Sequence, residues 1–337
     1  INRYYTNEFF SELKQKIKPG GILATQLPPT VNYMSEEARK MNAVLFSTLK
    51  ENFNNVLIIP GESNHFLASD SGLSTRVVEK MEQKNIPSEY VRYYLTDAQI
   101  KERSEYIMKN ITGHTTINRD FEPVSCYFQL HYWLSQFKTN YWIMIMVAGL
   151  AFAIILLRFD SVSFGLFAGG FAGSSIEMVL IVAYQVIYGY VYQMLGILIA
   201  VFMAGLAAGS FWSRKIFSVV SFRKFSFLLI ALTLLSFICP FILEFLNDVE
   251  RNIFLIHSFF FIIVFLAGIF TGSLFSIAGT MRKDAIASIS GVNYSADLLG
   301  AAVGALVFSA FLIPFLGIRN SCFFIGIMTL IGTLIIF

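Results

Sequence analysis

The sequence predicts a two-part protein: an α/β domain over residues 1–138, followed by a bundle of membrane-spanning helices over residues 139–337. The mean hydropathy is +0.63 and 14% of the residues are charged, whereas an ordinary soluble protein has roughly a quarter of its residues charged. The charge is also uneven, because residues 1–138 hold 16 Lys/Arg and 15 Asp/Glu, while the longer second part holds 9 and 7. The first part is therefore expected to face water and the second to lie in a membrane.

The composition argues against several classes of protein. The net charge of +3 is spread as +1 and +2 over the two parts, so no strongly basic face for nucleic acid is expected. Cys126, Cys239 and Cys322 lie far apart, without a CxxC motif or a Cys/His cluster, so neither a disulfide framework nor a metal site is expected. The sequence starts at Ile1 and enters a helical pattern almost at once, so we expect the natural N-terminus to lie upstream.

Apolar periodicity in the first part predicts the element order α-β-α-β-β, followed by further helices. Helices are expected over 7–17, 35–52 (with Ser35 as N-cap), 74–85 and 96–111, and strands over 22–27, 56–59 and 65–69. The five-residue turn at 60–64 predicts that the last two strands form an antiparallel hairpin. The strand over 22–27 is expected to be an interior parallel strand, which needs neighbours on both sides, so the domain is expected to be incomplete in this chain.

Six segments occur together in a specific combination. They are NRYYTNEFF at 2–10, KPGGILATQLP at 18–28, VLIIPGESNHFLASD at 56–70, INRDFEPVSCYF at 117–128, GFAGSSIEMVL at 170–180 and YSADLLGAAVGAL at 294–306. With them the chain resembles the polyamine aminopropyltransferase (spermidine synthase) family, in particular its bacterial branch fused to membrane helices. The resemblance implies that the first part is the C-terminal half of a class I methyltransferase-like (Rossmann-type) domain, truncated at its N-terminus, and that the second part is a multi-pass domain of the bacterial inner membrane.

The resemblance also implies a reaction, in which the aminopropyl group of decarboxylated S-adenosylmethionine passes to a polyamine such as putrescine. Such a transferase needs a glycine-rich nucleoside turn and carboxylates that hold and deprotonate the amine. In the family these elements belong to the first half of the domain, and this sequence has no GxGxG at the start of a βα unit. We therefore expect no catalytic residue, no bound cofactor and no transferase activity in this chain alone, with decarboxylated S-adenosylmethionine as cosubstrate of the complete protein.

Four residues are candidates for binding the amine. Gln26, at the carboxyl end of its strand, matches a family glutamine that contacts the amine, and the alternative is a loop amide bonded to nearby backbone. Tyr5 matches an aromatic position before the first family helix, with core packing as the alternative. Glu62 and Asn64 lie in the turn that stands in place of the family's second amine-binding loop, where Glu62 either holds an amine or is simply solvated.

Seven membrane spans are predicted from runs of about 20 mostly apolar residues. They lie near 140–157, 165–187, 191–212, 226–246, 253–275, 293–315 and 320–337. Small residues at helical spacing, at 204–209 and 300–304, predict close approach of neighbouring helices. Two intramembrane polar residues, Glu177 and Asp297, are functional candidates because charge inside a span is costly.

Glu177 is expected to face the interior of the bundle. Its expected partners are Asp297, Asn293 and Tyr294, and the alternative is a bond to the serines of its own helix, Ser174 and Ser175.

The loop charges and the resemblance favour different orientations. Arg158, the basic cluster at 214–224 and the pair at 282–283 share one side, which the positive-inside rule makes cytoplasmic. With seven spans the first part would lie outside, whereas the cosubstrate implied by the resemblance is cytoplasmic. We expect the α/β domain to be cytoplasmic, because loop charge governs long domains poorly.

Two classes of function compete. The first is an aminopropyltransferase-like enzyme fused to membrane helices, and the second is a multi-pass transport or binding protein with a non-catalytic α/β domain. Membrane lipid and a small polyamine are the expected partners, and the oligomeric state stays open.

Overall fold

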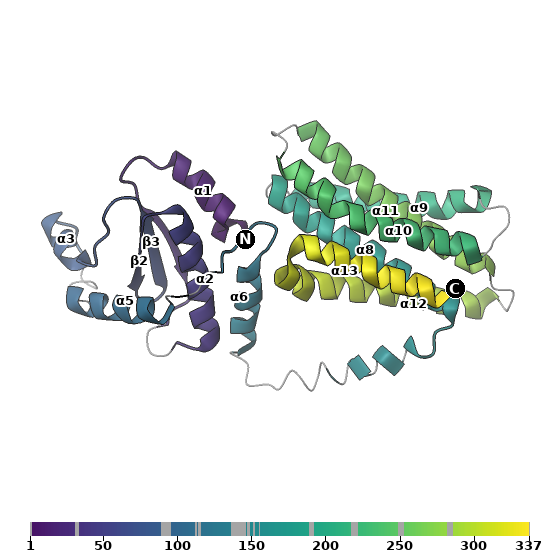
Figure 1. The fold of residues 1–337 in the computed structure, drawn as a ribbon, viewed down its shortest axis with the longest axis horizontal. Coiled ribbons are helices and arrows are strands. Elements are labelled where there is room, and N and C mark those ends of the chain that lie inside the picture. Colours follow the sequence, from purple (N-terminus) through teal and green to yellow (C-terminus); the bar gives the residue numbers. More distant parts are fainter. Residues whose placement is uncertain are drawn as a thin grey trace. The chain divides into compact units, whose positions relative to one another are not determined.

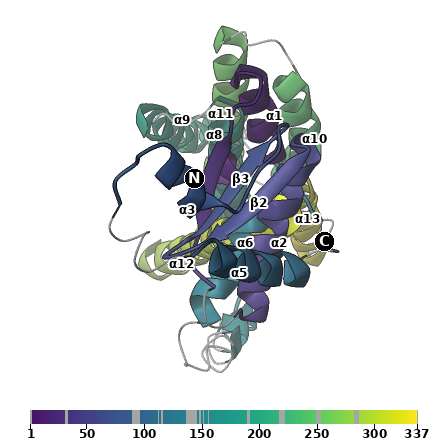
Figure 2. The same cartoon turned by 90° about the vertical axis from the view of Figure 1, so that its left-hand side faces the viewer.

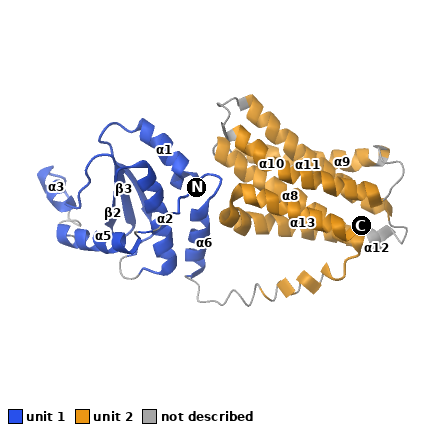
Figure 3. Ribbon diagram, in the orientation of Figure 1, with its two compact units in different colours: residues 1–138 blue, residues 139–337 orange. Residues whose placement is uncertain are grey.

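The computed structural model describes residues 2–30, 34–88, 96–111, 113, 116–135, 146, 149–150, 152–154, 156–188, 192–216, 222–248, 253–281 and 286–336. It divides into two compact units, residues 1–138 and residues 139–337 (Figure 3).

The first unit has a small sheet with helices packed against it (Figures 1 and 2). Its elements are η1 (Asn2–Tyr5), α1 (Asn7–Lys16), β1 (Leu23–Leu27), α2 (Glu36–Asn52), β2 (Asn55–Pro60), β3 (Asn64–Ser69), α3 (Val77–Gln83), α5 (Asp97–Ile111) and α6 (Val124–Ser135). From α1 to β3 the order is the expected α-β-α-β-β.

Side-chain caps set the starts of the first two long helices. The backbone N–H of Phe9 donates to the Thr6 hydroxyl at 3.4 Å, and that of Ala38 donates to the Ser35 hydroxyl at 3.1 Å. Each hydroxyl satisfies one backbone donor that has no partner inside its helix. The expected N-cap at Ser35 is therefore confirmed, whereas Thr6 as a cap was not expected from the sequence.

The sheet has the order β1-β3-β2, and both neighbouring pairs are antiparallel. The expected hairpin of the last two strands is confirmed, with Ile58 opposite Phe66 in the register. Because β1 and β2 both run against β3, they run parallel to each other.

The place of β1 differs from the expectation. In the described residues β3 alone pairs with β1, and it does so antiparallel, because the returning strand of the hairpin lies between the two parallel strands. Three short strands do not make a Rossmann-type sheet. The described residues of the first unit therefore show an α/β fold, but not a Rossmann-type domain.

The core of the first unit lies between one face of the sheet and its helices. Alternate residues of β2 and β3, among them Ile58 and Phe66, are fully buried against α2 and α5. Helix α2 contributes Leu45 and Leu49 to the same core. Burying a side chain of this size stabilises the fold by roughly 1.5–3 kcal/mol.

The second unit is a bundle of long apolar helices. They are α8 (Ser161–Tyr188), α9 (Tyr192–Ile216), α10 (Phe222–Asp248), α11 (Ile253–Met281), α12 (Ile286–Val307), the π-helical turn η2 (Phe308–Leu312) and α13 (Ile313–Ile336). Five segments are long and apolar enough to cross a membrane, and they are Ser161–Tyr188, Tyr192–Ser213, Phe222–Leu246, Phe254–Met281 and Gly291–Ile336. The unit is therefore a membrane-type helix bundle.

The fifth segment contains a break at Gly317, whose φ of 76° is a left-handed conformation that glycine adopts readily. Contacts with α8 show that α12 and α13 run in opposite directions, so this segment holds the expected sixth and seventh spans. The contacting pairs are Gly165–Ile336, Ala168–Gly332, Gly170–Asp297 and Ser175–Gly304. The expected first span, 140–157, lies largely outside the described residues.

Glycines let the helices of the bundle touch along their backbones. A Cβ atom at Gly209 of α9 would lie 2.1 Å from the carbonyl oxygen of Ile269 in α11, and one at Gly300 of α12 would lie 2.1 Å from that of Phe167 in α8. The predicted close approach at these small residues is confirmed. In lipid such contact replaces hydrophobic burial as a source of helix association.

Candidate functional site

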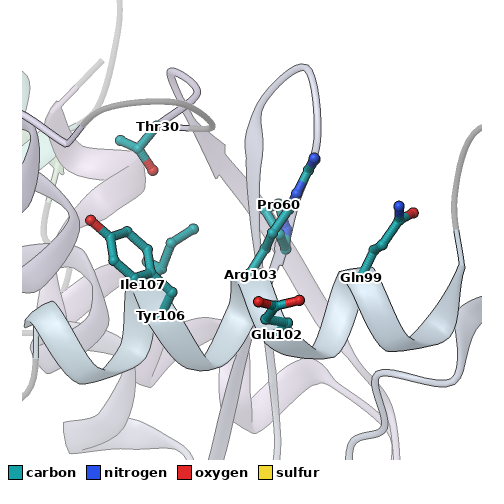
Figure 4. A pocket seen from close by; sticks show the side chains of 7 residues that line it. All are labelled: Thr30, Pro60, Gln99, Glu102, Arg103, Tyr106 and Ile107. Atoms are coloured by element: carbon teal, nitrogen blue, oxygen red, sulfur yellow. The ribbon is translucent and has the colours of Figure 1, made fainter.

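A cavity of about 410 Å³ opens in the first unit at the carboxyl ends of the two parallel strands (Figure 4). Thr30 follows β1 closely and Pro60 is the last residue of β2. Helix α5 forms the opposite wall and supplies the other lining residues, which are Gln99, Glu102, Arg103, Tyr106 and Ile107. In open α/β sheets ligands bind at the carboxyl ends of parallel strands, which makes this cavity the candidate site.

The pattern of α5 fixes which side chains reach the cavity. Ile100, Ile107 and Ile111 recur at helical spacing and are buried against the core. Glu102 and Tyr106 therefore lie on a neighbouring flank of the helix, exposed along the cavity. The start of α5 is tied to α3, because the carboxylate of Asp97 accepts the backbone N–H groups of Val78 at 2.8 Å and Glu79 at 3.1 Å.

The charged groups of the cavity are available to a ligand. In the described residues no hydrogen bond or ion pair engages the carboxylate of Glu102 or the guanidinium of Arg103. Figure 4 shows Arg103 directed towards Pro60, and Tyr106 lying below Thr30. A cation can therefore approach the Glu102 carboxylate and the face of the Tyr106 ring, while Pro60 and Ile107 offer apolar contact.

Two of the predicted site residues lie next to this cavity. The side-chain amide of Asn64 is buried and donates to the Thr30 hydroxyl at 2.7 Å and to the Asn42 side-chain oxygen at 3.0 Å. The hydrogen bond from Asn64 therefore fixes the position of Thr30 in the cavity wall. Glu62 is exposed in the turn that follows Pro60. Its role in amine binding stays a prediction.

The other two predicted residues lie apart from the cavity. Gln26 is exposed and pairs with His65 in the sheet register, between two residues that face the core. Tyr5 packs against the core, and its hydroxyl donates to the backbone oxygen of Gln26 at 3.4 Å. Neither side chain is among those that line the cavity.

Sequence reasoning missed the residues that α5 brings to the cavity. The available signal was the polar stripe at 99, 102, 103 and 106, beside the apolar stripe of a helix that follows the hairpin. That stripe is indistinguishable from an ordinary solvated face without knowledge of which strands end opposite it.

The intramembrane candidates are separated in the bundle. The carboxyl of Asp297 lies against Gly170 of α8, about two helical turns before Glu177, because the missing side chain of Gly170 leaves room for it. Glu177 is half-buried, and in the described residues no hydrogen bond or ion pair engages its carboxyl. The expected pairing of Glu177 with the Asp297 cluster is therefore not observed. Asn293 is buried one turn before Asp297, and neither atom of its amide has a partner in the described part.

No family model, curated protein or solved structure matches this chain in comparisons with known proteins. In the described residues no three His, Cys, Asp or Glu side chains come together as metal ligands.

Proposed function

We propose that the first unit is the amine-binding part of an aminopropyltransferase-type domain, and that the second unit fixes it to a membrane. The observation behind this proposal is the cavity at the carboxyl ends of the parallel strands β1 and β2, with the carboxylate of Glu102 unengaged at its edge. The aminopropyl group would come from decarboxylated S-adenosylmethionine, bound outside the residues that line this cavity.

The chemistry of the cavity suits a short polyamine. Its volume of about 410 Å³ falls within the range of small-molecule sites. An ammonium group would bind the Glu102 carboxylate and the Tyr106 ring face, and the methylene chain would lie along Pro60 and Ile107. Arg103 at the Pro60 side would repel a second ammonium group, so the free end of the amine would point out of the cavity, where a transfer partner can reach it.

The charge of the bundle supports a cytoplasmic α/β unit. Arg158, Arg223 and Lys224 lie at the end of the bundle where α8 begins, whereas Arg319 pairs with Glu244 at the opposite end, with 3.4 Å between Nη1 and Oε1. We place the more basic end in the cytoplasm by the positive-inside rule. If α8 to α13 make all the crossings, the first unit joins the bundle at this end and shares the compartment of the implied cosubstrate.

Calorimetry on the full chain in detergent tests amine binding. We expect putrescine or spermidine to bind the parent, and the uncharged analogue 1,4-butanediol not to bind. Glu102→Gln should weaken binding at least tenfold, because it removes the carboxylate that accepts the ammonium group. Glu105→Gln is the matched control, since Glu105 lies on the same helix, faces Lys101 at 3.9 Å and does not line the cavity. Equal affinity in the parent and Glu102→Gln would overturn the proposed site.

A second candidate function is transport or binding of a solute by the bundle. The observation that favours it is the amide of Asn293, which is buried one turn from Asp297 in α12 and has no partner among the described residues. Uptake of labelled polyamine into proteoliposomes that is lost in Asp297→Asn and kept in Glu102→Gln would support this function. Absence of uptake by the parent would exclude polyamine transport.

A further inference from the structure

The fold brings together two cysteines that lie far apart in the sequence. Cys239 in α10 and Cys322 in α13 are each 1% exposed and are neighbouring groups in the bundle. Both are free thiols in the structure. Cys126, the third cysteine, belongs to the first unit.

Other contacts between the two helices fix this pairing independently. The rings of Phe237 and Phe241 each lie 6.1 Å from that of Phe323, and Glu244 pairs with Arg319 at 3.4 Å. As the residue number rises along α10 it falls along α13, so the helices are antiparallel and residue 239 faces residue 322. Cys239 and Cys322 are thus part of a continuous interface between α10 and α13.

The same interface permits the approach that a disulfide needs. The Cα atoms of a disulfide usually lie 4.4–6.8 Å apart, which facing residues of helices packed with axes 8–10 Å apart can reach, because Cα atoms lie about 2.3 Å from each axis. One turn after Cys322, Gly326 has no side chain, and the ring of Phe237 occupies the space that a Cβ atom would fill, at 2.8 Å. The absent side chain lets the ring of Phe237 pack directly against α13 one turn from Cys322.

We propose that Cys239 and Cys322 form an oxidisable dithiol site, whose disulfide links α10 to α13 within the bundle. In this step two S–H bonds break and one S–S bond forms, and the two electrons and two protons pass to a lipid-soluble quinone, which becomes a hydroquinone. The oxidant is apolar because α10 and α13 belong to membrane-type helices, whose lipid surroundings hold quinones and exclude aqueous oxidants such as glutathione disulfide.

The position of the pair suggests what the bond would change. Cys322 lies five residues after Gly317, where the chain turns from α12 into α13. A link to α10 would hold the start of α13 beside the adjacent end of α10 and restrict rearrangement of this turn. The oxidised bundle is therefore the less mobile form.

Oxidation of the full chain in lipid nanodiscs tests the proposal. The reduced chain is treated with decylubiquinone, then unfolded and labelled with a maleimide, and disulfide peptides are mapped by mass spectrometry. We expect three labelled thiols before oxidation and one after it, with a peptide pair that joins residue 239 to residue 322. Cys126→Ser should still form this bond, whereas Cys239→Ser and Cys322→Ser should not.

Two results would overturn the proposal. One is a parent that keeps all three thiols after the quinone treatment, and the other is a disulfide that uses Cys126 as often as either bundle cysteine. Both are read from the parent chain, so the outcome does not depend on the folding of the variants. The hydroquinone formed should equal the disulfide formed, which separates oxidation by the quinone from oxidation by dissolved oxygen.

Discussion

The two units differ in how some of their buried polar side chains are paired. In the α/β unit a buried amide such as Asn118 is engaged on both sides, because its Nδ2 donates to the Tyr5 carbonyl and its Oδ1 accepts from the Ser125 N–H, each at 3.0 Å. In the bundle Ser175, Ser276 and Asn293 are buried and their side chains have no partner in the described residues. Backbone contact at glycines joins the helices there, together with side-chain hydrogen bonds such as that from Ser273 to the Gly209 carbonyl at 3.1 Å and that between Tyr184 and His257 at 2.7 Å.

This difference follows from the surroundings of each unit. In water, burial of apolar surface drives folding, and most buried polar groups recover the hydrogen bonds they lose. In lipid, association of helices gains little from apolar burial and depends on close packing. Stability should therefore be most sensitive to added volume in the bundle and to lost hydrogen bonds in the α/β unit.

The largest expected effect is at the glycine contacts. Gly209→Ala would place a Cβ atom 2.1 Å from the carbonyl oxygen of Ile269, so α9 and α11 must separate. We expect a loss of about 3 kcal/mol, measured as the unfolding free energy in detergent. Gly196→Ala in the same helix meets nothing within 4 Å and should be neutral or slightly stabilising, since alanine favours helix. Equal effects of the two changes would contradict the packing argument.

The next effect is the loss of a hydrogen-bonded amide in the α/β unit. Asn118→Ala leaves the Tyr5 carbonyl and the Ser125 N–H without their partner, at a cost of about 2–3 kcal/mol. Asn110→Ala is the control, because among the described residues that exposed amide donates only to the Tyr106 carbonyl one turn back. Hydrogen exchange of the first unit's amides in the full chain measures both. If Asn110→Ala were as destabilised as Asn118→Ala, the two hydrogen bonds of the Asn118 amide would not be what stabilises this region.

The smallest effect concerns the titration of Asp120. Burial raises the pKa of its carboxyl to about 6 from 3.8, and the charge of Glu8 adds to this, while a hydrogen bond with Thr6 opposes it. Between pH 4 and 6 the folded state then binds more protons than the unfolded state, so stability falls as the pH rises, by about 2 kcal/mol. Asp120→Asn should flatten this fall, measured by hydrogen exchange at several pH values. An unchanged pH profile in the variant would assign the fall to another group.

Much of the local structure could be predicted because its causes are local. The N-cap at Ser35, the hairpin around the 60–64 turn and the small residues of 300–304 each depend on short stretches of sequence. The pairing partner of β1 was harder to predict, because it depends on β3, which lies between β1 and β2 in the sheet.

The cavity and the thiol pair could not be predicted, because each joins segments distant in the sequence. Glu102 lines the cavity only because α5 packs opposite Pro60. Cys239 lies next to Cys322 only because α13 folds back along α10. The four predicted amine-binding residues came from the resemblance to a family and not from geometry, and they are divided between the cavity rim and other surfaces of the unit.

Photolabelling with a diazirine-bearing diamine tests most directly where the protein binds an amine. The full chain in nanodiscs is irradiated with the probe, with and without excess spermidine, and the labelled peptides are identified by mass spectrometry. We expect labelling of α5 around residues 99–107 that spermidine suppresses and that Glu102→Gln lowers at least tenfold. Suppressible labelling confined to α8 and α12 around Gly170 and Asp297 would contradict the proposed site and favour the bundle as the amine-binding unit.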